Sequence, residues 1–423
     1  MNEYDSDRIH NALDVEITGN PEEADYIIVN TCAIREKADQ KALSSLGRYK
    51  HLKSGNPDLI IGIAGCVAQL YGNKLLKQMP YLDFVLGPRA IPNLPRIISE
   101  IETENTRKID ISFDIEEVFE VNPYHEAGRV NAFVSIQQGC NKQCAYCIVP
   151  TVRGGEVNRP VEDIVKETVY LLSMGVREIT LIGQTVNSWK HEKYKFGDLL
   201  RIIGELEGVE RLRFTTSYPR DITKRMVDAM KEVKEVCSHI HLPVQSGSDS
   251  VLKLMQRTYT REWYLDSVSR LRDAIPDIAI STDMIIGFPG ETDSDFEQTV
   301  SLLDEVEFDS SFSFKYSPRP GTVGEKLAKT DAIDDKISGE RLSIFQEKQK
   351  YYTLKKNLER IGKTEEVLVE GFSKHDNNYL FGRTTHNRIL NFEGDGSLIG
   401  DLVNVRVEEG LPNSLRGVLQ NQH

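Results

Sequence analysis

The segment GCNKQCAYCIVP, residues 139–150, places three cysteines in one short loop, at Cys140, Cys144 and Cys147. Thiolates are the ligands that iron-sulfur clusters prefer. Three of them can hold three irons of a four-iron cluster, which leaves the fourth iron open to bind and reduce another molecule. The spacing therefore predicts a reactive [4Fe-4S] cluster in this loop.

Two other kinds of site compete with this interpretation. A zinc knuckle and a purely structural cluster both want a fourth protein ligand close to the first three. His125, upstream of Cys140, is the nearest candidate in the sequence. No compact zinc site can be completed from neighbouring residues, so the open cluster is favoured.

The length and composition limit the class of protein. The chain has 423 residues, too many for one core of ordinary size, so two or three domains are expected. Charged residues make up 28% and the longest apolar stretch, LIIGIAGC, is too short for a membrane span. We expect a cytoplasmic protein with no membrane partner. A net charge of -13 argues against general adhesion to nucleic acid, although a local basic patch would suffice.

Residues 1–104 have the pattern of a doubly wound α/β domain. DYIIVNTC, LIIGIAGC and YLDFVLG are typical of buried parallel strands, with helical patterns over 35–50 and 89–104. Cys32 and Cys66 each end one of these strands, so both are expected at the carboxyl edge of the sheet, where ligands of such folds gather. For either cysteine alone, a buried structural thiol is the competing interpretation.

A second α/β series follows a polar connector at 105–129. Six strand-like runs occur at intervals of a strand plus a helix, which predicts a partial (βα)6 barrel over 130–335. The six runs are AFVSIQ, EITLIG, RLRFTT, HIHLPV, IAISTDMII and FSFKYS.

The chain ends in a basic helix and a small β domain. Within 336–362, seven Lys and Arg face three Glu, so this linking helix is a candidate RNA contact, against the simpler reading of a solvated helix face. Residues 363–423 consist of short alternating strands separated by turns, which predicts a small OB-like all-β barrel of a kind that often binds RNA.

These features together resemble a known family. The cysteine spacing, Tyr146 just before the last cysteine and the six-unit barrel resemble radical S-adenosylmethionine (SAM) enzymes, in which the open iron binds SAM. The resemblance narrows to the radical-SAM methylthiotransferases, because segments along the whole chain match in order. These segments are NTCAIREKA, GIAGCVAQ, IVPTVRGGEVNRP, LIGQTVN, TTSYPRD, HLPVQSGSDSVLKLM, ISTDMIIGFPGET, KYSPRPGT and the LVEG, GRT and NR of a C-terminal TRAM barrel.

The resemblance implies a reaction. The nearest branch of the family, which shares MNEYDS and NTCAIREKA, adds a methylthio group to carbon 2 of N(6)-dimethylallyladenosine beside the anticodon of tRNA. The implied chemistry uses two [4Fe-4S] clusters and two SAM-derived steps, methyl donation and a 5'-deoxyadenosyl radical. The implied partners are tRNA and an electron donor such as flavodoxin or ferredoxin, and the chain is expected to act as a monomer.

The resemblance also assigns residues. Cys140, Cys144 and Cys147 would hold the SAM-binding cluster, and Cys32 and Cys66 would hold the second cluster. Polar residues at the ends of barrel strands would contact SAM, although each could instead cap a helix or close a turn. The cofactor-binding candidates are Tyr146, Gln184, Ser217, Gln245 and Asp283, and the RNA-binding candidates are Arg153, Lys355 and Lys356. Arg153 could equally meet the SAM carboxylate or form a salt bridge.

One departure from the family concerns the second cluster. The family takes a third cysteine from just before the methionine that opens this sequence, and only Cys32 and Cys66 are present. The expected first helix, around residues 5–14, also lacks a preceding strand. We expect the true start to lie upstream; with the start as it stands, the second cluster would be poorly held while SAM cleavage could survive.

Three other functions stay open at this point. Within the same chemistry, the substrate could be threonylcarbamoyl-adenosine in tRNA or an aspartate of a ribosomal protein. The chain could also be a noncatalytic iron-sulfur protein that binds RNA. The open iron implied by the three cysteines argues against this last class.

Overall fold

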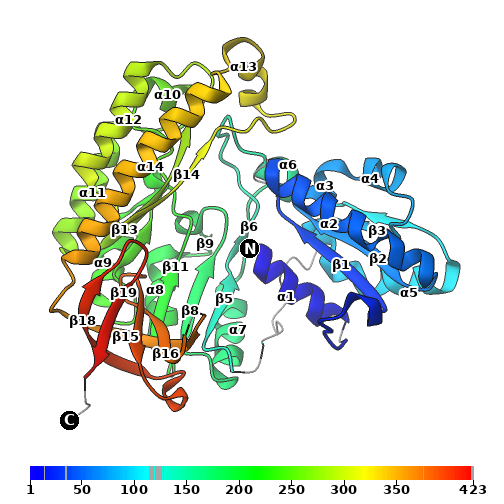
Figure 1. Ribbon diagram of the computed structural model, residues 1–423, viewed down its shortest axis with the longest axis horizontal. Coiled ribbons are helices and arrows are strands. Elements are labelled where there is room, and N and C mark those ends of the chain that lie inside the picture. Colours follow the sequence, from blue (N-terminus) through cyan, green and yellow to red (C-terminus); the bar gives the residue numbers. More distant parts are fainter. Residues whose placement is uncertain are drawn as a thin grey trace. The chain divides into compact units, whose positions relative to one another are not determined.

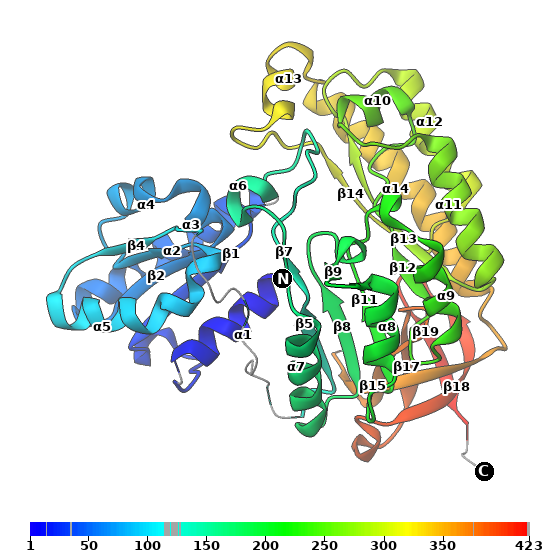
Figure 2. The ribbon, with the colours of Figure 1, turned by 180° about the vertical axis from the view of Figure 1, so that it is seen from behind.

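The computed structural model describes residues 1–13, 15–33, 36–113, 119, 126, 128–374 and 376–420, with the side chains of 36–38 and 377 left aside. His125 and most of the expected connector lie outside these residues. The chain forms two compact units (Figures 1 and 2). Unit 1 comprises Met1–His125, Gln137–Arg159 and Ser317–Thr322, and unit 2 comprises Glu126–Ile136, Pro160–Tyr316 and Val323–His423. The cysteine loop therefore belongs to the same unit as the N-terminal sheet.

Unit 1 contains a four-stranded parallel sheet in the order β1-β2-β3-β4. Its strands are β1 (Tyr26–Thr31), β2 (Ile60–Gly65), β3 (Phe84–Leu86) and β4 (Lys108–Asp110). The first three confirm the predicted strands. Within the connector predicted over 105–129, Lys108–Asp110 pairs in register with β3 as an edge strand.

Helices cover both faces of this sheet. Alternate residues of β2 enter different cores: Ile61 and Ile63 pack with Leu46 and Leu75, whereas Ile60 packs with residues of the first and fifth helices. The doubly wound α/β prediction is confirmed. The helices are α1 (Asn2–Leu13), η1 (Pro21–Glu23), α2 (Glu36–Gly55), α3 (Cys66–Tyr71), α4 (Asn73–Gln78), η2 (Pro88–Asn93), α5 (Leu94–Glu104) and α6 (Val149–Arg153).

Unit 2 contains the six predicted barrel strands, all parallel to their neighbours. They form two three-stranded sheets, β11-β8-β5 and β12-β13-β14. A parallel bridge between Leu212 and Val236 joins the two sheets, so the spatial order follows the sequence. The strands are β5 (Asn131–Ser135), β8 (Glu178–Ile182), β11 (Arg211–Phe214), β12 (His239–His241), β13 (Ala279–Ile286) and β14 (Ser310–Lys315). The partial (βα)6 barrel is confirmed.

Helices follow the barrel strands and close their outer side (Figure 1). They are α7 (Val161–Ser173), η3 (Val186–Ser188), α8 (Phe196–Gly204), η4 (Pro219–Asp221), α9 (Lys224–Glu232), α10 (Asp249–Leu254), α11 (Arg261–Ala274), α12 (Asp293–Val306), α13 (Val323–Asp331) and α14 (Asp335–Leu358). Two short antiparallel pairs complete the described strands: β6 (Gln137–Gln138) pairs with β7 (Val157–Asn158) in unit 1, and β9 (Lys190–His191) pairs with β10 (Tyr194–Lys195) in unit 2. The long helix α14 packs on α12 and β14.

The C-terminal strands close into a small barrel in the order β15-β16-β17-β19-β18. Its core is apolar, with Val367, Val405 and Phe392 fully buried, because alternate residues of each strand point inward. The prediction of a small all-β barrel is confirmed. The strands are β15 (Thr364–Ser373), β16 (Asp376–Thr384), β17 (Ile389–Glu393), β18 (Leu402–Gly410) and β19 (Leu415–Leu419), with η5 (Gly396–Leu398) between the third and fourth.

Candidate functional site

The cysteine loop lies between β6 and β7, and hydrogen bonds hold its two ends together. Cys140 N donates to Gly154 O at 3.1 Å, and Arg89 Nη2 donates to Gly155 O at 2.5 Å. Gly139 has a φ of +75°, and a Cβ there would lie 2.1 Å from Gly155 O, so only glycine fits. The loop is thus closed through backbone groups.

Within the loop, backbone N–H groups donate hydrogen bonds to two of the cysteines. Lys142 N donates to Cys140 Sγ at 3.4 Å, and Cys147 N donates to Cys144 O at 3.0 Å. Cys140 is buried, whereas Cys144, Cys147 and Tyr146 are half-buried. All six cysteines of the chain lie in the described ranges, and none forms a disulfide.

The donor set of the loop fits an iron-sulfur cluster. A single zinc ion needs four ligands that converge on one point, whereas each thiolate of a four-iron cluster binds its own iron. Three cysteines from one loop suit the cluster by ligand type and number.

The structure places Cys32 and Cys66 at one edge of the N-terminal sheet, as the sequence predicted. Thr31 ends β1 and is the register partner of Gly65, which ends β2, so the two cysteines follow side by side. Gly65 has a φ of +91°, and a Cβ there would lie 2.4 Å from Thr31 O. This close approach of β1 and β2 brings both cysteines to the carboxyl edge of the sheet.

Arg153 contacts Cys66 of this pair. It ends α6, just beyond the cysteine loop, is only 5% exposed, and pairs with Asp5 of α1. Burial raises the pKa of the Cys66 thiol, and the guanidinium of Arg153, which hydrogen-bonds to that thiol, acts in the opposite direction. The RNA contact expected of Arg153 does not fit this burial.

Buried polar atoms beside Cys66 have capacity left for a further group. Within the described residues, Arg153 Nη1 and Asp5 Oδ1 are buried without a hydrogen-bond partner. An unpaired buried donor is costly, and hydrogen bonds to cluster sulfurs are one way in which proteins tune iron-sulfur sites. The residues at this edge therefore fit an anionic iron-sulfur group.

A second buried ion pair lies in unit 1 and escaped the sequence analysis. Arg319, from the segment Ser317–Thr322, pairs with Asp39 near the start of α2, and both side chains are buried. Tyr71 Oη also donates to Asp39, at 3.3 Å. This pair anchors a segment that follows the last barrel strand to the N-terminal unit, and no local sequence signal joins residues so far apart in the chain.

Three of the four polar barrel residues, Gln184, Ser217 and Gln245, lie just beyond the carboxyl ends of their strands, as predicted. Asp283 was predicted at a strand end as well, but it lies within β13, because this strand continues to Ile286 and pairs with β14 beyond that point. Ser217 Oγ and Gln184 Oε1 are buried and have no hydrogen-bond partner among the described residues. Gln245 adopts a φ of +77°, and its N donates to Asp283 O at 2.9 Å. Ser217 N donates to His241 O, which brings the β11 and β12 ends together. Polar atoms without partners here are available to a ligand.

Other residues of the barrel interior were missed in the sequence. His241 Nε2 lies 3.4 Å from Asp283 Oδ1, and His241 Nδ1 lies 3.0 Å from Ser281 Oγ. The ring of Phe312 is edge-on to His241, with 6.0 Å between centroids. Period-two alternation in HIH and STD could have indicated that these side chains share one face.

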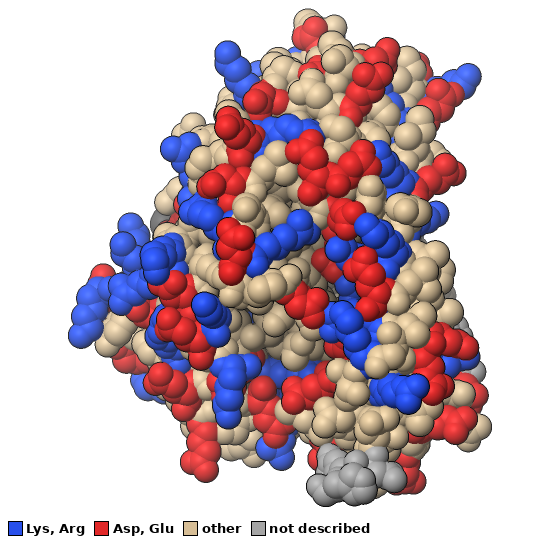
Figure 3. Space-filling view, turned by 90° about the vertical axis from the view of Figure 1, so that its left-hand side faces the viewer, with Lys and Arg blue, Asp and Glu red and all other residues tan. Residues whose placement is uncertain are grey.

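The basic helix is neutralised by its neighbours. Lys355 and Lys356 both pair with Glu307, at 2.6 and 3.2 Å, and Lys348 pairs with Asp304. On the face drawn in Figure 3, Lys and Arg are interspersed with Asp and Glu. Lys355 and Lys356 are partly exposed, so an RNA contact there stays a prediction. Their charges are largely neutralised by Glu307, the residue that follows α12.

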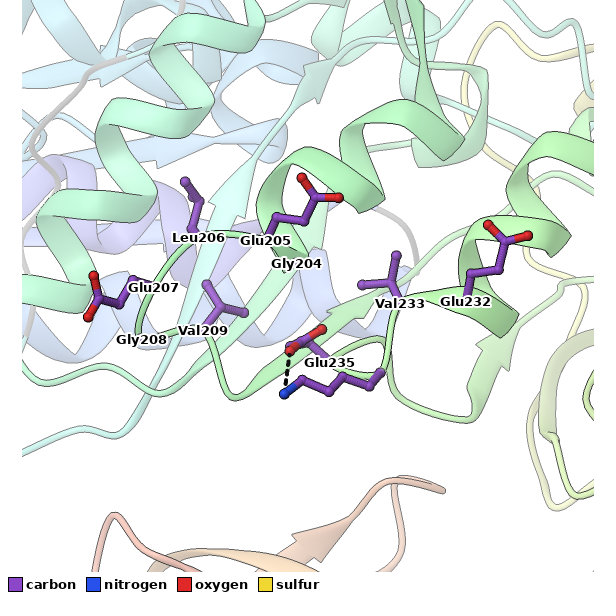
Figure 4. A pocket seen from close by; sticks show the side chains of 10 residues that line it. Gly204, Glu205, Leu206, Glu207, Gly208, Val209, Glu232, Val233 and Glu235 are labelled. Carbon is purple, nitrogen blue, oxygen red and sulfur yellow. Dashed lines mark ion pairs between the residues drawn. The ribbon is translucent and has the colours of Figure 1, made fainter.

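A hollow lies between residues 204–209 and residues 232–235 (Figure 4). It has a volume of about 500 Å³ and is formed by the loops that precede β11 and β12, at the amino ends of the strands. Its lining includes Glu205, Glu207, Glu232 and Glu235. Barrel enzymes use the opposite, carboxyl end for chemistry, so we assign this acidic hollow no role.

Three family models match the chain. They are the Radical SAM superfamily over residues 134–303, the TRAM domain over 359–419 and Uncharacterized protein family UPF0004 over 1–87. The tRNA-2-methylthio-N(6)-dimethylallyladenosine synthase of Stutzerimonas stutzeri is 44% identical over 424 residues, covering 99% of this chain and 97% of that protein. The synthase of the same name from Aromatoleum aromaticum is 45% identical over 428 residues, covering 99% and 96%.

The chain belongs to the tRNA-2-methylthio-N(6)-dimethylallyladenosine synthase family. This confirms the resemblance to the radical-SAM methylthiotransferases. Among solved structures, the radical SAM methyltransferase TsrM from Kitasatospora setae matches with a TM-score of 0.58 at 14% identity, over 78% of this chain and 73% of that one. OxsB, a cobalamin-dependent radical SAM enzyme, matches with a TM-score of 0.52 at 15% identity, over 79% and 49%. These likenesses show the fold alone.

Among the described residues, no helix is both long enough and apolar enough to cross a membrane.

Proposed function

We propose that this chain adds a methylthio group to carbon 2 of N(6)-dimethylallyladenosine beside the anticodon of tRNA. The observation that carries the proposal is similarity along the whole chain to synthases of that name, at 44–45% identity. The three-cysteine loop that such chemistry requires is present, at Cys140, Cys144 and Cys147.

The loop cysteines would hold a [4Fe-4S] cluster, and Cys32 and Cys66 would contribute to a second one. A cluster bound at the loop would supply the electron that cleaves SAM reductively. Arg153 would offset the negative charge that gathers around Cys66. Gln184, Ser217, Gln245 and Asp283 would orient SAM, because the first three follow barrel strands and Asp283 lies within one. Gln184 Oε1 and Ser217 Oγ have no partner within the described chain.

The partners follow from the same assignment. tRNA would bind with help from the C-terminal barrel, which matches the TRAM model. We further propose a flavodoxin or ferredoxin as electron donor, and action as a cytoplasmic monomer. Lys355 and Lys356 remain RNA-contact candidates.

The test is a complete reaction with a reconstituted protein. The chain, loaded anaerobically with iron and sulfide, is incubated with SAM, a reductant and tRNA that carries N(6)-dimethylallyladenosine. We expect release of 5'-deoxyadenosine and, by mass spectrometry of tRNA nucleosides, the methylthio product. Absence of 5'-deoxyadenosine would favour a noncatalytic RNA-binding protein. Modification of threonylcarbamoyl-adenosine alone would overturn the substrate assignment.

A further inference from the structure

Arg153 lies between the two groups of cysteines in unit 1. It is the last residue of α6, the helix that follows the cysteine loop, and α6 packs on α3, the helix that begins at Cys66. Val152 of α6 belongs to the same apolar core as Val67 and Ala68 of α3. The end of the loop is therefore fixed on the helix that carries Cys66.

The side chain of Arg153 is held on two sides by the N-terminal part of unit 1. It pairs with Asp5 of α1 and contacts the thiol of Cys66. Asp5 is completely buried and Arg153 is nearly so. Separating two such buried charges is strongly unfavourable, so the guanidinium has little freedom to move.

The main chain just after Arg153 closes the cysteine loop. Gly154 N donates to Pro150 O at 3.1 Å, and Gly154 O accepts from Cys140 N at 3.1 Å. The next carbonyl, that of Gly155, accepts from Arg89 Nη2 at 2.5 Å. The residue next to Arg153 thus fixes the backbone of the first cysteine of the loop.

A short path therefore joins Cys66 to Cys140. It runs from the Cys66 thiol to the guanidinium of Arg153, along the main chain to Gly154, and through one hydrogen bond to Cys140 N. The peptide bond between Arg153 and Gly154 is planar and stiff, so a shift of Arg153 displaces Gly154 O as well. Residues around a metal site that orient its ligands in this way commonly control how firmly the metal is held.

We propose that Arg153 is a positioning residue that couples the two cysteine sites. Held by Asp5 and Cys66, it sets the position of Cys140 as a ligand of the loop cluster. The inference rests on the proposed function for the cluster itself, and it adds that the loop holds iron less firmly when the Cys66 thiol is removed. Coupling between two sites is reciprocal, so a cluster in the loop also favours the place of the guanidinium beside Cys66.

The test measures the loss of iron from the loop. Every protein carries Cys32→Ser, which removes one of the two thiols of the second site, so the iron bound after anaerobic reconstitution, about four atoms per chain, reports the loop. Release of this iron to an excess of a colorimetric chelator is timed. Arg153→Met is expected to speed release by about tenfold, because Gly154 O is no longer held. Arg96→Met, at an exposed arginine of α5 that pairs with Glu100, is the matched control and stays within about twofold.

A double substitution separates positioning from stability. Asp5→Asn with Arg153→Met removes both buried charges and restores stability to unit 1, which circular dichroism measures. Iron release from this variant is expected to stay about tenfold faster, and the electron paramagnetic resonance signal of its reduced cluster is expected to differ from that of the parent. Release at the parent rate with the parent signal would show that Arg153 acts through stability alone, and would overturn the positioning role.

The contact with Cys66 has its own test. Cys66→Ala is expected to speed iron release from the loop by about threefold when Arg153 is present. In the Arg153→Met background it is expected to add nothing further, because Cys66 acts through the guanidinium. Independent, multiplicative effects of the two substitutions, or no effect of Cys66→Ala, would refute the coupling.

These measurements need no turnover. A protein that shows the coupling but forms no methylthio product refutes the proposed function and not the role of Arg153. A protein that forms the product, while its Arg153→Met variant releases iron at the parent rate, refutes the role of Arg153 and not the proposed function.

Discussion

Arg153 shows how much one buried side chain can join. The sequence placed it after the cysteine loop, with a phosphate, the SAM carboxylate or a salt bridge as possible partners. In the structure it lies in the protein interior, where it pairs with Asp5 and hydrogen-bonds to Cys66. Two buried charges are tolerable only when each satisfies the other, since moving either from water costs several kcal/mol.

Removal of this guanidinium should therefore be costly. Arg153→Met leaves the Asp5 carboxylate buried and unpaired, and we expect the free energy of unfolding of unit 1 to fall by about 3 kcal/mol. Both tryptophans, Trp189 and Trp263, lie in unit 2, so their fluorescence reports that unit while circular dichroism reports both. We expect a circular-dichroism transition at lower denaturant with little change in tryptophan fluorescence.

A double substitution tests whether the loss of stability comes from the unpaired Asp5 carboxylate. Asp5→Asn combined with Arg153→Met removes both charges, so it should recover at least half of the lost stability. A loss of under about 1 kcal/mol in Arg153→Met alone would show that the pair contributes little.

The loop cysteines can be tested with a matched cysteine elsewhere. Cys147→Ser is expected to lower bound iron by about four per chain after reconstitution and to abolish 5'-deoxyadenosine release, because one iron loses its thiolate. Cys237→Ser is the control, since Cys237 is buried beneath the barrel and away from the loop in sequence. Iron content is determined colorimetrically on both variants. Full iron content in Cys147→Ser would contradict the assignment of this loop.

At the scale of elements, the start of α12 organises two loops. Thr292 and Asp295 form a reciprocal capping box, in which Asp295 N donates to Thr292 Oγ1 and Thr292 N donates to Asp295 Oδ2 at 2.9 Å. The other oxygen of Asp295 accepts from Ser248 Oγ at 2.6 Å and from Ser250 Oγ. The segment that carries Ser248 and Ser250 is thus tied to the start of α12.

These bonds make stability depend on pH. Burial alone would raise the pKa of Asp295, but the donors from Ser248, Ser250 and Thr292 hold it well below its ordinary value. A lowered folded-state pKa gives stability that is present above about pH 4 and is lost as pH falls below it. We expect Asp295→Asn to lower the free energy of unfolding by about 2 kcal/mol at pH 7.

The comparison with the parent chain is made by urea unfolding at pH 7 and at about pH 3. The difference between parent and Asp295→Asn should shrink at the lower pH, since the Asp295 carboxyl of the unfolded parent chain then binds a proton while that of the folded chain stays ionised. Asp228→Asn, in a surface ion pair on α9, should change stability by less than about 1 kcal/mol at either pH. A difference that stays constant with pH would refute the carboxylate's role.

At the scale of the whole molecule, unit 2 fixes its C-terminal barrel with arginines. Arg213 of β11 donates to Thr384 O at 2.7 Å and pairs with Glu178 of β8 at 2.8 Å. Arg211, also of β11, donates to Arg383 O and to Glu366 O. Backbone carbonyls of the small barrel are thus satisfied by side chains of the large one, which makes the two a single docked body.

Arg213 provides the prediction at this scale. Arg213→Met leaves Glu178 buried without its partner, and we expect the free energy of unfolding reported by tryptophan fluorescence to fall by about 3 kcal/mol. Proteolysis within residues 359–363, which join α14 to the small barrel, should become faster. Arg201→Met, which breaks an exposed pair with Glu232, should cost less than about 1 kcal/mol. Equal effects of the two substitutions would contradict the docking role.

Local sequence patterns were sufficient to predict most of the strands. The six barrel strands, three N-terminal strands and five C-terminal strands follow from apolar runs and turn residues, whose spacing is set by the backbone itself. The pattern failed at β4, because Lys108–Asp110 is short and half-polar, and an edge strand gains its stability from pairing with β3 rather than from burial. Lys355 and Lys356 read as a basic patch because their partner Glu307 lies far along the chain.

The sequence by itself determined the order of domains and predicted the ligand set of the cysteine loop, because a cluster is recognised by ligand type and spacing within a few residues. It also determined that Cys32 and Cys66 share an edge, since parallel strands end together. Only the tertiary structure decided the partners of Arg153, the placement of Arg319 in unit 1 and the pairing of Phe312 with Asp283. Each of these contacts joins residues from separate segments, and whether a charged or aromatic side chain is buried depends on packing that no local pattern encodes.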